Sequence, residues 1–172
     1  FVLDADEMSR EVVKPNSSVL QEIVDHFGKQ VLDKNNKLDR KALGKIIFDK
    51  EQDRRWVEDL LHPAIWLQTK KRVIEHGLLR SPTLWFYEAS LIFERSYEDS
   101  FKEVWLTWCS NKTQIIRTAG RSGISQKYAE DLIKNQLSHA EKLARSHFTL
   151  NTDMEKKEVL AMVDSRLKKI TS

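Results

Sequence analysis

The chain has 172 residues, of which 40% are hydrophobic and 32% charged, and its net charge is +3. This composition excludes a disordered tail, a collagen-like repeat and a disulfide scaffold, and no apolar run reaches the roughly 18 residues of a transmembrane helix. The single cysteine, Cys109, cannot form an internal disulfide, which favours a reducing compartment. Lys and Arg exceed Asp and Glu by only 29 to 26, too little to indicate nucleic-acid binding.

The first half of the chain predicts one short strand followed by helices. Phe1 to Leu3 is an apolar run that predicts a strand, with Asp4 and Asp6 at its carboxyl end. Apolar residues at helical spacing, capping residues and glycines predict helices over 19–27, 40–48, 49–61 and 63–77. In the last of these, Pro63 suits the first turn, and His62 immediately precedes it.

The second half alternates between strands and helices. Strands are predicted over 83–87, 104–109 and 147–150, and helices over 113–118, 126–145 and 153–170. We expect Gly120 to interrupt the first of these helices. Strands that alternate with helices indicate a parallel sheet covered on both faces, so the predicted fold class is α/β, in one domain.

Asp4 and Asp6 are the first residues that suggest chemistry. If the strand continues through them, both carboxylates point to one side of it, where they could hold Mg²⁺ or orient a substrate hydroxyl. The alternative is that they cap the helix that follows, because aspartate is a common N-cap residue. Spacing alone leaves both interpretations open.

Arg117 and Arg121 are a second candidate pair, four residues apart and therefore on one helix face. Beside Gly120 and Gly123, two guanidinium groups suit a mobile element that clamps phosphate, although a solvated helix face explains them equally well. His62 is either a ligand contact or a structural residue at a helix start. The sequence has no Walker-A motif and no His/Cys metal-binding pattern.

Taken in chain order, short motifs along nearly the whole sequence resemble those of the dephospho-coenzyme A kinase family. The strings that carry this resemblance are Leu3-Asp4-Ala5-Asp6, His26-Phe27-Gly28, Leu38-Asp39-Arg40, Leu61-His62-Pro63 and Leu91-Ile92-Phe93-Glu94, followed by Gln114, Arg117, Arg121 and Asn151.

The resemblance implies a three-layer, parallel-sheet P-loop kinase fold with a helical substrate-binding domain and a lid. We expect one kinase domain over residues 1–172, with an acceptor-binding region over 14–80 and a lid region over 117–145. The implied reaction transfers the γ-phosphoryl group of ATP, with Mg²⁺, to the 3′-hydroxyl of dephospho-coenzyme A. The expected protein is cytoplasmic, binds neither nucleic acid nor membrane, and is a monomer or a weak homo-oligomer.

On the acceptor side, the resemblance assigns Asp6 as the catalytic base that accepts the hydroxyl proton. Asp4 matches a supporting carboxylate near the metal, and it is grouped with Arg10 and His62 as substrate-binding. None of these residues is predicted as a metal ligand.

On the donor side, the resemblance makes Arg117 and Arg121 lid arginines that close over ATP. Arg121 is also predicted to be catalytic, because it offsets charge on the transferring group. Asn151 falls in the segment near the adenine. The chain departs from the family pattern directly after it, where Thr152-Asp153-Met154 lacks the usual asparagine and glycine.

Family members open with a strand, a Walker-A loop and a helix before the Asp-Ala-Asp string. We therefore expect the natural protein to begin upstream of Phe1, because a chain that started there would lack its main phosphate-binding loop. Two other functions stay open: a non-catalytic protein that binds the acceptor without a P-loop, and a P-loop kinase for another small molecule. Nucleic-acid binding is disfavoured because basic residues alternate with acids, as in 155–158.

Overall fold

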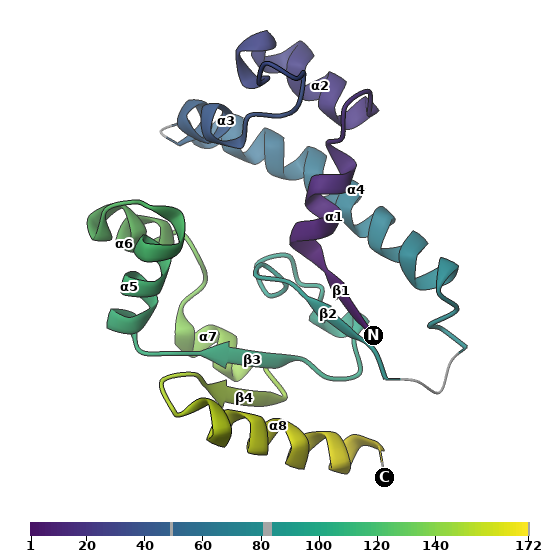
Figure 1. Cartoon of the computed structure of the whole chain (residues 1–172), viewed down its shortest axis with the longest axis vertical. Coiled ribbons are helices and arrows are strands. Elements are labelled where there is room, and N and C mark those ends of the chain that lie inside the picture. Colours follow the sequence, from purple (N-terminus) through teal and green to yellow (C-terminus); the bar gives the residue numbers. More distant parts are fainter. Residues whose placement is uncertain (49, 81–83, 172) are drawn as a thin grey trace. The chain divides into compact units, whose positions relative to one another are not determined.

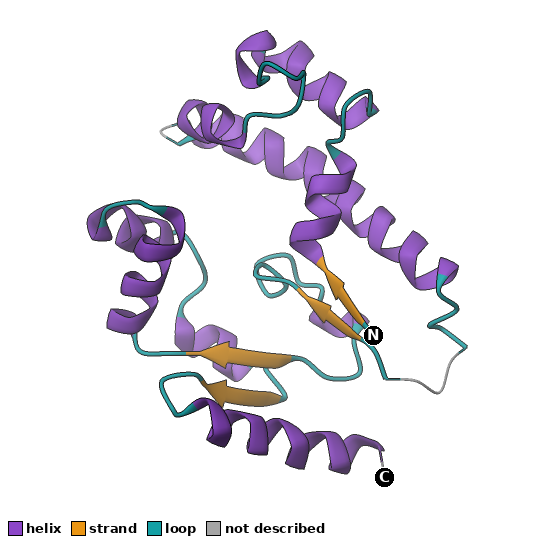
Figure 2. Cartoon of the chain, in the orientation of Figure 1, coloured by secondary structure: helices purple, strands orange, loops and turns teal. Residues whose placement is uncertain are grey.

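The computed structural model describes residues 1–48, 50–80 and 84–171 (Figure 1). The chain divides into two compact units, Phe1–Ser90 and Leu91–Ser172. Each unit combines helices with two paired strands (Figure 2). Within the described ranges, no helix has both the length and the apolar character needed to cross a membrane.

The first unit contains two strands and a group of helices between them. In chain order its elements are β1 (Val2–Asp4), α1 (Ala5–Val12), α2 (Ser18–Phe27), the short 3₁₀ helix η1 (Lys29–Val31), α3 (Arg40–Ile47), α4 (Glu51–Glu75) and β2 (Phe86–Glu88). The two strands pair in parallel, with Leu3 opposite Tyr87. Leu3 is buried against Val73 and Leu78, which joins the strand pair to the end of α4. The strand predicted over 83–87 is shorter and runs over Phe86–Glu88, and the first predicted position, Thr83, lies outside the described residues.

Capping residues set the ends of α2 and α3 where the sequence predicts them. The Ser17 hydroxyl accepts a hydrogen bond from the backbone N–H of Leu20 at 3.1 Å. Gly28 ends α2 with φ of +81°, a conformation that favours glycine. The carboxylate of Asp39 accepts from the N–H groups of Lys41 and Ala42. Between these caps, the helices bury one apolar cluster formed by Val13, Ile23, Phe27, Val31, Leu43 and Val57.

One long helix, α4, replaces the two that the sequence predicts over 49–61 and 63–77. Pro63 lies inside it, although an interior proline costs about 3 kcal/mol. Val57 and Val73 on either side of Pro63 are buried in separate clusters, and burying one such side chain contributes roughly 1.5–3 kcal/mol. Packing at both ends therefore keeps the helix continuous. The predicted first residue, Asp49, lies outside the described residues.

A partly buried ion pair fixes α1 against α4. The carboxylate of Glu11 accepts hydrogen bonds from Gln68 Nε2 at 2.8 Å and Arg72 Nη2 at 2.6 Å. Burial raises the pKa of Glu11, but the hydrogen bonds from Gln68 and Arg72 outweigh it and hold that pKa below the ordinary 4.5. The orientation of α1 therefore depends on an ionised Glu11.

The second unit contains a second pair of parallel strands, as the predicted parallel sheet requires. Its elements are η2 (Glu98–Ser100), β3 (Trp105–Trp108), α5 (Asn111–Ser122), α6 (Gln126–Lys134), α7 (His139–Ala144), β4 (Phe148–Asn151) and α8 (Lys156–Thr171). The strands β3 and β4 are parallel, with Trp105 opposite Phe148 and Trp108 opposite Asn151. The prediction of parallel strands between helices is confirmed in both units.

The helices predicted over 113–118 and 126–145 differ from those of the structure. The helix α5 runs through Gly120 and ends at Gly123, whose φ is +62°. A glycine inside a helix costs only about 1 kcal/mol relative to alanine, and its neighbour Ala119 is buried. The predicted helix over 126–145 is two helices, because Ser138 and Glu141 form a capping box that starts α7.

Ion pairs attach α7 to the segment before β3. Lys142 Nζ lies 2.6 Å from the carboxylate of Glu94, and Arg145 pairs with Glu98. Arg145 also lies over the ring of the buried Phe93. These contacts fix the end of the predicted lid region, 117–145, to the body of its own unit.

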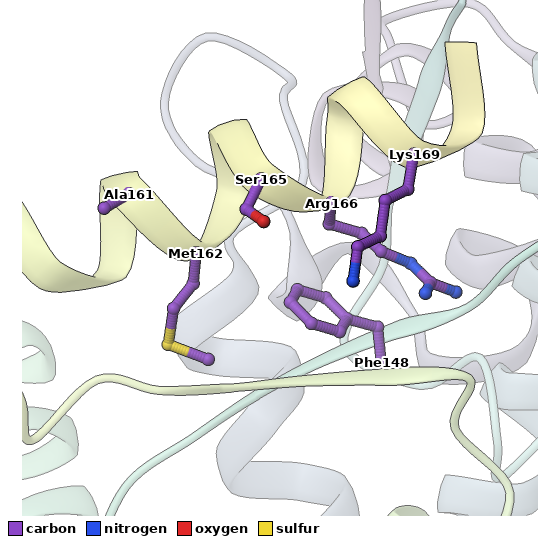
Figure 3. A pocket seen from close by; sticks show the side chains of 6 residues that line it. All are labelled: Phe148, Ala161, Met162, Ser165, Arg166 and Lys169. Atoms are coloured by element: carbon purple, nitrogen blue, oxygen red, sulfur yellow. The ribbon is translucent and has the colours of Figure 1, made fainter. Parts of the chain in front are cut away.

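A shallow hollow of about 340 Å³ lies between β4 and α8 (Figure 3). Phe148 lies below the helix in this view, and the guanidinium of Arg166 is 5.3 Å from its ring. Phe148 is the first residue of β4, whereas the candidate residue Asn151 is the last. The hollow is therefore at the opposite end of the strand from the candidate site.

We expect replacement of Glu11 by glutamine to lower the melting temperature at pH 7 by about 2–4 °C. Since the folded-state pKa of Glu11 is lowered, its stabilisation is complete above the ordinary 4.5 and is lost as the pH falls through the folded-state value. The melting temperatures of the two proteins should therefore converge in acid. A difference that stayed constant from pH 7 to pH 3 would show that Glu11 does not act through its charge.

Candidate functional site

In each unit, one strand of the parallel pair ends at a candidate residue. Asp4 is the last residue of β1, and Asn151 is the last residue of β4. Ligands of α/β proteins bind beyond the carboxyl ends of parallel strands. The candidate residues therefore follow the strand ends where a ligand is expected.

Asp4 and Asp6 do not lie on one strand, and of the two interpretations the helix cap is confirmed for Asp4. The strand ends at Asp4, whose Oδ1 accepts a hydrogen bond from the N–H of Asp6 at 2.7 Å and so caps α1. Asp6 occupies the first turn of the helix, where a negative charge is favourable. Its carboxylate is exposed and has no hydrogen bond or ion pair within the described residues. It is therefore available to accept a proton.

Two arginines lie near the turn of α1 that carries Asp6. Arg10 lies one turn after Asp6 and is exposed, with no salt bridge among the residues that the structure describes. Arg40, on α3, donates from Nη2 to the carbonyl oxygen and the hydroxyl of Ser9, at 3.1 and 3.0 Å. The sequence reasoning gave Arg40 no role, although it quoted the Leu-Asp-Arg string that contains it. His62 lies in the middle of α4 and is half-buried, so it is not a helix-start residue as expected.

In the second unit, Arg117 is attached to the end of β4. Its guanidinium donates from Nη1 to the hydroxyl of Thr152 and from Nη2 to the carbonyl oxygen of Thr152, both at 2.9 Å. Thr152 in turn donates from its hydroxyl and its backbone N–H to the carbonyl oxygen of Trp108, at 3.0 and 2.7 Å. Thr152 thus joins the ends of β3 and β4 to the middle of α5.

Asp153 connects the loop that follows β4 to Ser110, the N-cap of α5. Its carboxylate accepts from the backbone N–H of Ser110 at 2.6 Å, and this bond, with the side chain of Thr113, lowers its pKa. The side-chain oxygen of Asn151 accepts from the N–H of Asp153 at 2.9 Å. Because Asp153 is engaged in this way, α8 starts at Lys156 instead of at 153 as predicted. The sequence reasoning missed Thr152 and Asp153, which it treated only as departures from a pattern.

Arg121 contrasts with Arg117, although both lie on α5. It is in the last turn of the helix, is exposed, and forms no hydrogen bond or salt bridge with any described residue. Its guanidinium is therefore available to an anion. The chain offers an unpaired carboxylate in its first unit and an unpaired guanidinium in its second.

No group of three or more His, Cys, Asp or Glu side chains that could hold a metal occurs within residues 1–48, 50–80 and 84–171. A metal held mainly by several protein ligands is therefore not a feature of this part of the chain. A metal that binds one or two carboxylates and the oxygens of a substrate remains compatible with it.

The Thr152 contacts predict a local effect on α5. Thr152→Val keeps the shape of the side chain but removes the hydroxyl that accepts from Arg117 and donates to Trp108. We expect amide hydrogen exchange in the middle of α5 to accelerate about threefold to tenfold, because each lost hydrogen bond contributes roughly 0.5–1.5 kcal/mol. Thr152→Ser should restore the slow exchange. Equal exchange in the valine and serine variants would contradict the role of the hydroxyl.

Comparison with known proteins gives the family. The sequence profile of the family described as "CoaE: Dephospho-CoA kinase" matches residues 1–158. A protein named dephospho-CoA kinase from Prochlorococcus marinus (strain MIT 9312) is 37% identical over 162 residues, covering 91% of this chain and 77% of the relative. The dephospho-CoA kinase of Geobacter sulfurreducens is 35% identical over 152 residues, covering 88% of this chain and 77% of the relative.

Solved structures share the fold. TT1252 from Thermus thermophilus superposes with a TM-score of 0.77 at 24% identity, covering 99% of this chain and 85% of that protein. Dephospho-CoA kinase from Campylobacter jejuni superposes with a TM-score of 0.70 at 22% identity, covering 99% of this chain and 84% of that protein. These likenesses confirm the α/β fold class of P-loop kinases that the sequence motifs implied. The profile and the relatives show that this chain belongs to the dephospho-CoA kinase family.

Proposed function

We propose that this protein transfers the γ-phosphoryl group of ATP to the 3′-hydroxyl of dephospho-coenzyme A, giving coenzyme A and ADP. The observation that carries this function is the family match over residues 1–158. In the reaction, the hydroxyl oxygen forms a bond to the γ-phosphorus while the bond from that phosphorus to the bridging oxygen breaks. The proton of the hydroxyl passes to a base, and ADP leaves.

Asp6 is the base in this proposal. Its carboxylate is exposed and free of partners among the described residues, and the capping of α1 by Asp4 fixes the helix turn that carries it. A carboxylate is a weak base, so its contribution lies in its position beside the hydroxyl. Arg10, one turn later, and His62, on α4, complete the proposed acceptor side within the region 14–80 and the helix before it.

Arg121 is the proposed contact for the transferring phosphoryl group. The unpaired guanidinium can donate two parallel hydrogen bonds to phosphate oxygens and offset the negative charge of the transition state. Arg117 and Asn151 are proposed to lie on the ATP side, where the Thr152 contacts hold Arg117 in place. We propose 117–145 as the lid and the whole chain as one kinase domain.

Mg²⁺ is proposed to bind together with ATP. Its preference for one or two carboxylates with phosphate and water oxygens is compatible with Asp4, the supporting carboxylate at the start of α1, which has one oxygen outside the helix cap. When bound, the ion would neutralise charge on the phosphates. We further propose that the enzyme works in the cytoplasm as a monomer or weak homo-oligomer.

The assignment of Asp6 predicts a loss of turnover. In the full-length natural protein, Asp6→Asn should lower kcat by at least about 100-fold, because a positioned base contributes 10²–10⁴-fold, and should change the KM values by less than about threefold. The measurement is ADP release that requires both ATP and dephospho-coenzyme A. Glu7→Gln is the matched control, since Glu7 is an exposed acid in the same helix turn. A near-normal kcat for Asp6→Asn would mean that another group is the base.

The assignment of Arg121 predicts a similar loss from the donor side. Arg121→Gln should lower kcat about 100-fold, since one donor to developing charge contributes about 10²–10³-fold. Lys112→Gln removes a charge from an exposed position on the same helix and should leave kcat within twofold. If the two variants behaved alike in steady-state assays, Arg121 would be part of a solvated helix face.

A further inference from the structure

A second arginine reaches the face of α1 that carries Asp6 and Arg10. Arg40 is the first residue of α3, and its Nη2 donates to both the carbonyl oxygen and the hydroxyl of Ser9. Ser9 directly precedes Arg10, and Asp6 lies one helix turn before them. The contact therefore brings two guanidinium groups from different helices to one place in the first unit.

These two arginines lie close enough to affect each other electrostatically, and neither has a salt-bridge partner among the described residues. Both acceptors of Arg40 are neutral oxygens, and neither Arg10 nor Arg40 forms a salt bridge with a carboxylate of the described residues. Burial lowers the pKa of Arg40, and the neighbouring positive charge of Arg10 lowers it further, while Asp6 acts in the opposite direction. Arg40 remains largely exposed, so a ligand can reach it. Two neighbouring positive charges with only the single negative charge of Asp6 near them favour a ligand with more than one negative charge.

Dephospho-coenzyme A has such a group. A diphosphate joins the 5′ carbon of its ribose to the pantetheine part, and the 3′-hydroxyl lies on the other side of the same ribose. On α1, the proposed base and the first arginine are also separated, by one helix turn of about 5.4 Å. A ribose placed against this turn would present its hydroxyl to Asp6 and its diphosphate to the arginines.

We propose that Arg40, positioned by Ser9, binds the diphosphate of dephospho-coenzyme A together with Arg10. This inference rests on the proposed function, because it assigns a further contact to the same acceptor. Arg40 keeps several N–H donors that Ser9 does not use, and these are directed to the phosphate oxygens. Ser9 restricts the arginine side chain before the substrate arrives and so reduces the entropy lost on binding.

The test is calorimetric titration of dephospho-coenzyme A and, separately, of ATP into the full-length natural protein. Arg40→Gln should raise the Kd of dephospho-coenzyme A about tenfold and leave the Kd of ATP within twofold, since charge-assisted hydrogen bonds to one ligand are lost. Lys41→Gln is the matched control, because it removes a charge from the next residue of α3, and its Kd values should equal those of the wild type. Equal affinities in Arg40→Gln and Lys41→Gln would overturn the inference.

Arg40→Lys separates charge from shape. Lysine keeps the positive charge but not the planar group that donates to Ser9, so we expect its Kd for dephospho-coenzyme A to rise only about threefold. If lysine were as weak as glutamine, the contact would not be with an anion, and the assignment to the diphosphate would be wrong. If Arg40→Gln does not fold, the test uses Arg40→Lys instead. Its Kd for dephospho-coenzyme A should rise about threefold, while that of Lys41→Gln should equal the wild-type value.

The wild-type titration separates this inference from the function on which it rests. If the wild-type protein gives no heat with dephospho-coenzyme A, the proposed function itself is contradicted. If the wild type binds and Arg40→Gln binds equally well, only the role of Arg40 is contradicted. A parallel loss of ATP affinity in Arg40→Gln would show a general structural effect and would also overturn the diphosphate contact.

Discussion

Parallel pairing of very short strands is the constraint on which the rest of this structure depends. Strands of three or four residues are not stable alone, so each pair relies on helices packed against it. In the first unit, Leu3 of β1 is buried against Val73 of α4. In the second, Arg166 of α8 donates to Glu103, which also accepts from the indole of Trp105 in β3. Parallel pairing then places both strand ends at one edge, and the helices that carry the candidate residues begin there.

Ion pairs show which charged side chains are already engaged in holding the fold together. Ion pairs between distant segments hold helices in place, as for Glu11 with Arg72 and Lys142 with Glu94. Asp6 and Arg121, by contrast, have no ionic partner in the described part of the chain. An unpaired charge on a fixed turn can meet a charged ligand without first breaking a protein contact. The family motifs, and not the missing ion pair alone, favour these two residues as substrate contacts, because exposed charges such as Glu7 and Lys112 also lack an ion pair in the described part of the chain.

The sequence predicts those features that depend on neighbouring residues. The ends of α2 and α3 were predictable because Ser17, Gly28 and Asp39 act on backbone groups within a few positions. Continuity of α4 through a proline was not, because distant apolar clusters decide it. The family motifs identified the candidate residues of the site, whose roles stay predictions. The positioning contacts, such as Thr152 with Arg117 and Ser9 with Arg40, join segments far apart in sequence, and no local pattern reports them.

The central claim is that one phosphoryl group passes from ATP to the 3′-hydroxyl of dephospho-coenzyme A. Phosphorus nuclear magnetic resonance of the products formed by the full-length protein tests it most directly. The account predicts a new phosphomonoester signal that couples to the proton on the 3′ carbon, in equal amount to the ADP formed. ADP without this signal, or a phosphoryl group attached at another position, would contradict the account.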